Sequence, residues 1–169
     1  MTGAWSVRPE GDGDAQAVHE VNAAAFPTPA EADLVDELRR DPAAWIDGLS
    51  YVAEQDGEII GHALLTRATV GGTPVLALAP CAVVPAQQGT GVGTAVISAL
   101  LDAARRIGDE TVVVLGHADY YPRFGFVPAS RFGISAPVTV PDDSFLALPL
   151  TAAARVPSGV ISYPAAFGL

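Results

Sequence analysis

The chain has 169 residues, half of them hydrophobic, which is enough for one domain with a buried core. Nineteen acidic residues against nine arginines, with no lysine, give a formal net charge of −10 at pH 7. A surface of this charge repels phosphate backbones, which argues against nucleic-acid binding. It favours a cationic small molecule or peptide as partner, unless the charge serves only to keep the protein in solution.

The start of the chain and its cysteine content indicate a cytoplasmic protein. No apolar run reaches membrane-spanning length, and residues 1–14 lack the basic and apolar segments of a secretory signal. Cys81 is the one cysteine, which excludes an internal disulfide and a cysteine-based metal cluster. We therefore expect no membrane partner and no metal.

A strand and two helices are predicted in the first quarter of the chain. Residues 5–10 read as a short opening strand. Apolar residues at three-to-four spacing then predict helices over 12–26 and 30–41. The segment 26–29, Phe-Pro-Thr-Pro, separates the two helices, and Pro42 ends the second.

Three antiparallel strands follow, near 50–55, 58–70 and 74–84. The dipeptides Asp-Gly and Gly-Gly between them are hairpin-turn signals. The third strand is apolar almost throughout, as expected of a central strand that is buried on both faces. Pro80 lies inside it. Because proline cannot donate to a strand ladder, we expect a bulge or a local separation of strands there.

The remaining elements alternate between helix and strand. A helix over about 91–107 precedes a β-branched strand at 111–116, and a strand, a helix and a strand in this order predict a right-handed crossover with parallel pairing. Residues 118–126 predict a short helix or turn that leads into another strand. Further strands are expected near 145–150 and, at a sheet edge, within 159–167.

Three glycines, Gly89, Gly91 and Gly93, stand between the third strand and the long helix. Free amides at a helix N-terminus attract anions, and glycines let a phosphate approach the backbone. A P-loop is excluded because the chain has no lysine, and the dinucleotide fingerprint has a different glycine spacing. The pattern Gln/Arg-x-x-Gly-x-Gly/Ala is satisfied from Gln88 onward. The alternative is a turn that serves only packing between helix and strand.

The stretch VVPAQQGTGVGTAVISALL resembles motif A of the GCN5-related N-acetyltransferase (GNAT) superfamily, and GHADYYPRFGFVPA resembles its motif B. The order of elements also matches. Nearly the whole chain, including FPTPAEADLVDELRRDP and YVAEQDGEIIGHALLT, is similar to a bacterial YhbS-like subgroup of predicted acetyltransferases. The resemblance implies an α+β, three-layer GNAT fold. Its mixed central sheet would have six to seven strands, splayed between strands four and five, with helices on both faces and residues 1–169 forming one domain.

The resemblance implies acetyl-CoA as cosubstrate. In the family, the end of the third antiparallel strand pairs with the pantetheine arm and the glycine loop holds the pyrophosphate. Carried over, these residues are Cys81, Ala82 and Val83 on the strand, and Gln88, Gly89, Thr90, Gly91, Val92, Gly93 and Thr94 in the loop. Thr90 stands where the family often has a basic residue, so one charge-assisted contact is missing. Cys81 is either a small buried thiol or an acetyl-carrying nucleophile.

The resemblance also implies a general acid. Tyr121 matches the tyrosine that donates a proton to the departing CoA thiolate, although the adjacent Tyr120 could fill the role, or both could only pack. Candidates for the base are His117, Glu31 and water, whereas His62 in mid-strand is more typical of a core histidine. A backbone amide near Val83 would meet the oxyanion.

The predicted function is acetyl transfer from acetyl-CoA to a primary amine of a small molecule or peptide, by direct attack in a ternary complex. The alternatives are a non-catalytic acyl-CoA-binding regulatory module of the same fold, and a nucleotide-dependent oxidoreductase or kinase-like protein. Residues 129–169, the C-terminal strands and tail, match no chemistry; they either close the acceptor cleft or form a homodimer contact.

Overall fold

The computed structural model describes residues 4–169. The helices are α1 (Ala15–Ala25), α2 (Ala30–Arg39) and α3 (Val92–Arg106). The strands are β1 (Ser6–Pro9), β2 (Ser50–Gln55), β3 (Glu58–Val70), β4 (Thr73–Val83), β5 (Thr111–Leu115), β6 (Val127–Pro128), β7 (Ile134–Ser135), β8 (Phe145–Pro149) and β9 (Gly159–Ser162). Within this part of the chain, every helix is too short or too polar to traverse a lipid bilayer.

The strands form one mixed sheet in the order β1-β2-β3-β4-β5-β8-β6. The β4–β5 pair is parallel and the other pairs along this path are antiparallel, so the predicted crossover through α3 is confirmed. Strands β7 and β9 lie off the path. The predicted edge strand is β9, which pairs with Thr69 and Val70 of β3, because β3 continues beyond Leu64, the partner of the first residue of β2.

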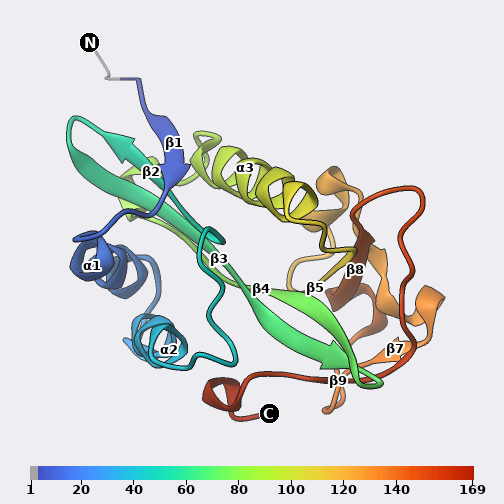
Figure 1. Ribbon diagram of the computed structural model, residues 1–169. Helices are drawn as coiled ribbons and strands as arrows, with labels where there is room; N and C mark the ends of the chain where they lie inside the picture. Colours follow the sequence, from blue (N-terminus) through green and yellow to red (C-terminus); the bar gives the residue numbers. More distant parts are fainter. Residues whose placement is uncertain (1–3) are drawn as a thin grey trace.

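Helices cover both faces of the sheet, as expected: α3 lies on one face, and α1 and α2 lie on the other (Figure 1). The alternation of side chains along β3 explains this arrangement. Ala63 and Leu65 pack into the core under α3, whereas Leu64 between them packs with residues of α1 and α2. Side chains of β3 thus enter the core on both faces of the sheet. This is why apolar residues follow one another along β3 instead of alternating with polar ones.

The sheet separates between β4 and β5. These strands pair only at Leu76 with Val112 and at Ala77 with Val113, although both strands run on past that point. The register between β3 and β4 shifts where Ala79 and Pro80 stand opposite the single residue Leu64. The predicted bulge at Pro80 and the predicted splay between strands four and five are therefore both confirmed.

The C-terminal segment covers the end of the sheet that the helices leave open. Ile134, Phe145 and Ile161 form a separate apolar cluster with Val75 and Val113. The apolar side chains of the C-terminal segment thus complete a core that the central strands begin.

Candidate functional site

A cavity of about 520 Å³ opens where β4 and β5 separate. Its walls come from the end of α1, from β3 and β4, from the glycine loop with the first turns of α3, and from the segment after β5. Most of the residues that the sequence assigned to the site line it, namely Cys81, Ala82, Val83, Gln88, Gly89, Gly91, Gly93, Thr94, His117 and Tyr121. The sheet therefore brings together residues that are distant in sequence.

The glycine loop presents backbone to this cavity. Gly89 and Gly91 have φ angles of +77° and +93°, which favour glycine, and no described atom lies within 4 Å of a Cβ built on either residue. Gly91 is the N-cap of α3, and no side chain of the described residues caps this end. The first amides of α3 therefore lack a partner within the helix and carry the positive end of its dipole. This wall suits an anion.

Two residues of the loop turn their side chains away from the cavity. The Thr90 hydroxyl donates to the carbonyl of Gln87 at 2.5 Å, and Val92 is buried under the sheet, close against Gly61. Gln88 reaches back along the loop, and its side-chain amide donates to the Val83 carbonyl at 3.0 Å. This bond ties the loop to the end of β4. Thr90 and Val92 could therefore act only through their main-chain atoms.

The wall opposite the loop is formed by β4 and the segment after β5. Beyond Ala77, β4 pairs with β3 alone, so Cys81, Ala82 and Val83 have no strand on their other side within residues 4–169. A splayed edge of this kind can pair with an extended ligand through main-chain hydrogen bonds.

Tyr121 projects into the cavity beside Cys81. Its ring lies so close to the Gly116 backbone that a Cβ at that position would be 2.3 Å from Cε2, and Phe126 packs edge-on against it at 5.8 Å between centroids. Burial raises the pKa of the Tyr121 phenol well above its usual range, and the neighbouring Cys81 adds to the rise. Tyr121 therefore keeps its proton at any physiological pH.

Cys81 is also held in its protonated form. Burial raises the pKa of its thiol to about 12, although its interaction with Tyr121 opposes the rise. A nucleophilic cysteine needs a depressed pKa or an adjacent base, and the structure gives Cys81 a raised one. In these surroundings Cys81 behaves as a small apolar side chain.

The three candidate bases lie in different places. His117 follows β5, is exposed and lines the cavity. Glu31 on α2 is absent from the cavity lining; it lines a separate hollow with Leu34, Ala166 and Phe167, where its Oε2 is buried without a hydrogen-bond partner among residues 4–169. The C-terminal turn therefore lies against the residue that sequence reasoning assigned to the acceptor.

His62 lines the cavity, but both of its ring nitrogens are occupied. The Asn22 side-chain amide donates to Nδ1 at 3.0 Å, so Nε2 carries the proton and donates to the Ser50 hydroxyl at 2.9 Å. Ser50 in turn donates to Glu10 at 2.8 Å. Burial lowers the pKa of His62 to about 4, although the Glu10 carboxylate opposes the shift. This is a satisfied, neutral core histidine, as its mid-strand position suggested.

Tyr120 and Arg123 complete the mouth of the cavity. The Tyr120 hydroxyl is 3.0 Å from the Thr94 hydroxyl, in the first turn of α3, and its ring packs edge-on against Tyr121 at 5.1 Å between centroids. Arg123 stacks on Tyr120, with its guanidinium carbon 4.2 Å from the ring centroid. Arg123, and the pair Ala25 and Phe26 at the end of α1, were missed by sequence reasoning.

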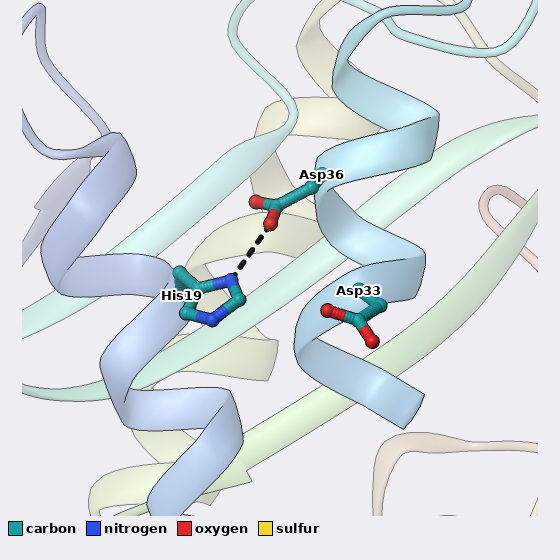
Figure 2. Close-up of side chains that lie close together, drawn as sticks. All are labelled: His19, Asp33 and Asp36. Carbon is teal, nitrogen blue, oxygen red and sulfur yellow. Dashed lines mark hydrogen bonds and ion pairs between the residues drawn. The ribbon is translucent and has the colours of Figure 1, made fainter. Parts of the chain in front are cut away.

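A cluster of potential metal ligands lies outside the cavity. His19 of α1 and Asp33 and Asp36 of α2 place three ligand atoms within 4.8 Å of one another (Figure 2). His19 Nδ1 is already bonded to Asp36 at 2.7 Å, and Asp33 is exposed. None of the three lines the cavity, so this cluster is a contact between α1 and α2 that lies outside the site.

A model of the acetyltransferase (GNAT) family matches residues 15–126. The chain belongs to the GNAT family. The matched residues include α1, the glycine loop and Tyr121. Two relatives from Escherichia coli strain K12 are the uncharacterised N-acetyltransferases YjhQ and YhbS. YjhQ is 44% identical over 77% of this chain and 74% of its own length. YhbS is 31% identical over 70% of this chain and 71% of its own length.

Solved GNAT structures share the whole fold. The structure of YhbS from Escherichia coli in complex with CoA has a TM-score of 0.89 and 26% identity, covering 100% of this chain and 94% of that chain. A GNAT family acetyltransferase from Brucella melitensis in complex with acetyl-CoA has a TM-score of 0.80 and 31% identity, covering 97% and 98%. The GNAT fold that the resemblance implied is therefore confirmed, and its C-terminal strands are shared with these neighbours.

Proposed function

We propose that this GNAT protein transfers an acetyl group from acetyl-CoA to a primary amine of a small molecule or peptide, by direct attack in a ternary complex. The observation that carries the proposal is that three features open onto one cavity: the unpaired edge of β4, the bare amide terminus of α3 and a partly buried, protonated tyrosine. Relatives of this fold are solved with CoA and with acetyl-CoA.

The residues present fit acetyl-CoA. The amides from Gly89 to Thr94 would hold the diphosphate, since a Cβ at Gly89 or Gly91 would point into open space and the helix dipole favours negative charge. The edge at Cys81–Val83 would pair with the amide groups of the pantetheine arm, in the manner of an added strand. Cys81 then serves as an apolar contact, because its thiol is protonated.

Each catalytic task falls to a named group. A main-chain amide near Val83 would stabilise the negative charge that develops on the thioester oxygen. As the new N–C bond forms and the C–S bond breaks, Tyr121 would transfer its phenolic proton to the sulfur. The raised pKa of Tyr121 keeps the phenol protonated in the resting enzyme, so its proton is present when the thiolate departs. This transfer leaves CoA as the thiol and Tyr121 as a phenolate, which takes a proton from solvent afterwards.

The proton that leaves the amine goes to water or to His117. His117 is the histidine of this cavity that remains exposed, whereas His62 has no free nitrogen. Glu31 lies in another hollow, so we retain it only as a contact for the remote end of a long acceptor. Since acetyl-CoA is a cytoplasmic metabolite, the proposal places the protein in that compartment.

The test is a thiol-release assay over a panel of primary amines that includes diamines, amino acids and short peptides, corrected for hydrolysis of acetyl-CoA without amine. The proposal predicts amine-dependent release of CoA and an acetylated product by mass spectrometry. Tight CoA binding with no turnover across the panel would favour the regulatory module instead. Absence of CoA binding would contradict both functions.

A further inference from the structure

The cavity is unusual for a protein of this charge. Although the chain carries nineteen acidic residues, none of the residues that line the cavity within 4–169 is Asp or Glu. Arg123 is the arginine of its lining among these residues. The glycine loop itself, from Pro85 to Thr94, contains no charged side chain. The electrostatic character of the cavity therefore comes from the α3 terminus and from Arg123.

Arg123 is held in place by two contacts that leave the outer part of its guanidinium available. Nε donates to the Tyr120 carbonyl at 2.8 Å, and the guanidinium lies over the Tyr120 ring at 4.2 Å. No acceptor within residues 4–169 bonds its two terminal nitrogens. These nitrogens form the planar fork that binds phosphate oxygens in pairs.

Tyr120 connects this cation to the helix terminus. Its ring carries Arg123 on one side, and its hydroxyl lies 3.0 Å from the Thr94 hydroxyl in the first turn of α3. Tyr120 therefore contacts both the guanidinium and the first turn of α3, and all three line the same cavity. An anion bound at the helix terminus would lie within reach of both.

We propose that Arg123 binds a phosphate group of coenzyme A and supplies the positive charge that the glycine loop lacks. The proposal rests on the function proposed above. CoA carries two kinds of phosphate, the diphosphate bridge and the 3′-phosphate, and both present the oxygens that a guanidinium recognises. The position of Arg123 beyond the motif A loop explains how a lysine-free chain with Thr90 in that loop can still hold a polyanion.

The test measures the dissociation constant of CoA by calorimetry for wild type and for Arg123→Gln at several salt concentrations. We expect Arg123→Gln to weaken CoA binding about tenfold at low salt and to make the dependence on salt less steep. Arg131→Gln is the matched control, because Arg131 is exposed, lines none of the described cavities and removes the same charge. It should bind CoA as wild type does.

A second ligand, 3′-dephospho-CoA, identifies the phosphate. If the tenfold difference between wild type and Arg123→Gln disappears with this ligand, Arg123 binds the 3′-phosphate; if the difference persists, it binds the diphosphate. Arg123→Lys keeps the charge and guards against a folding defect in the glutamine variant, and it should retain most of the salt dependence. Equal CoA affinity and equal salt dependence in wild type and Arg123→Gln would overturn the proposal, whereas a wild type that binds no CoA would overturn the function beneath it.

Discussion

The two walls of the cavity are built from different parts of the chain. The loop wall presents main-chain amides from a single run of residues, Gly89 through Thr94, and its shape depends on two glycines with positive φ. The opposite wall presents side chains that the sheet collects from β3, β4 and the segment after β5. The amides of the loop wall do not titrate, whereas the opposite wall contains groups whose pKa values burial has shifted.

This difference separates binding from chemistry. A wall of amides keeps the same charge at every pH, so it suits a ligand that must be held throughout the reaction. On the opposite wall, the partly buried Tyr121 and Cys81 and the buried His62 each keep one protonation state near neutrality. Substitutions in the glycine loop should therefore change CoA affinity, and substitutions of Tyr121, Cys81 or His62 should change turnover or the pH dependence of stability.

The largest effect is expected for Tyr121→Phe. Removing the proton donor should lower kcat by about a hundredfold to a thousandfold. The CoA dissociation constant should stay unchanged, because the ring and its packing on Gly116 remain. Tyr120→Phe is the matched control, since it removes only the bond to Thr94. Steady-state kinetics and calorimetry measure the two quantities, and a larger kcat loss in Tyr120→Phe would reassign the acid to that residue.

His62 should make the stability of the protein depend on pH. Its pKa is lowered from 6.5 to about 4 in the folded state, so the unfolded chain binds a proton first as pH falls. The contribution of neutral His62 to the free energy of unfolding is fully present above pH 6.5. It is lost as the pH falls from about 6.5 to 4. The total loss from this group is on the order of 3 kcal/mol.

Urea unfolding of wild type and His62→Gln across this pH range tests the point. The variant loses hydrogen bonds to Asn22 and Ser50, so it should be less stable at every pH, but its stability should fall less steeply below pH 6.5. Carboxylates titrate in both proteins and cancel in the difference. Parallel curves for the two proteins would show that His62 is not kept neutral by folding.

The loop wall was predictable from sequence because its features are local. The glycine spacing, the helix that follows and the strand that precedes lie within one short segment, and Pro80 indicated the bulge in β4. The helices and central strands were predictable for the same reason, since hydrophobic periodicity reports which face is buried.

The side-chain wall was only partly predictable, because periodicity does not say what covers a buried face. Phe26 gave a signal as a helix breaker before proline, but nothing in the sequence placed it at the cavity. Glu31 faces the C-terminal turn at Phe167, and that packing depends on a chain reversal more than a hundred residues away. The place of Arg123 at the cavity could not be predicted, because it depends on the contacts of Tyr120 with both Arg123 and Thr94.

Two alanine substitutions on the loop wall should have opposite effects on stability. Gly91→Ala forces a side chain into φ +93° and should lower the free energy of unfolding by about 1–2 kcal/mol, with weaker CoA binding. Gly93 lies within α3, where a Cβ would meet Val83 and Tyr120 at 3.4 and 3.6 Å. Gly93→Ala should therefore keep or slightly raise stability and still weaken CoA binding, because its methyl group points at the cavity. Thermal unfolding and calorimetry separate these outcomes, and equal destabilisation of both variants would mean that φ is not the cause.

The smallest effect is expected for Thr90→Arg, which adds a cation to the loop wall. Thr90 is exposed and its hydroxyl bonds only to the Gln87 carbonyl, so the change should leave the fold intact. If the amides of this wall already hold the diphosphate, an exposed arginine adds a contact that solvent and salt screen, worth about 0.5–1 kcal/mol or a twofold to fivefold gain in CoA affinity.

The size of that gain decides how the two sources of positive charge are related. Thr90→Arg should give a larger gain in CoA affinity in the Arg123→Gln background than in wild type if either arginine can neutralise the same phosphate. Full additivity of the two changes would instead place the cations on different phosphates, because independent sites add and shared ones do not. A gain of a hundredfold from Thr90→Arg alone would contradict the view that main-chain amides dominate this wall, since it would show that the loop binds weakly until a side chain supplies the charge.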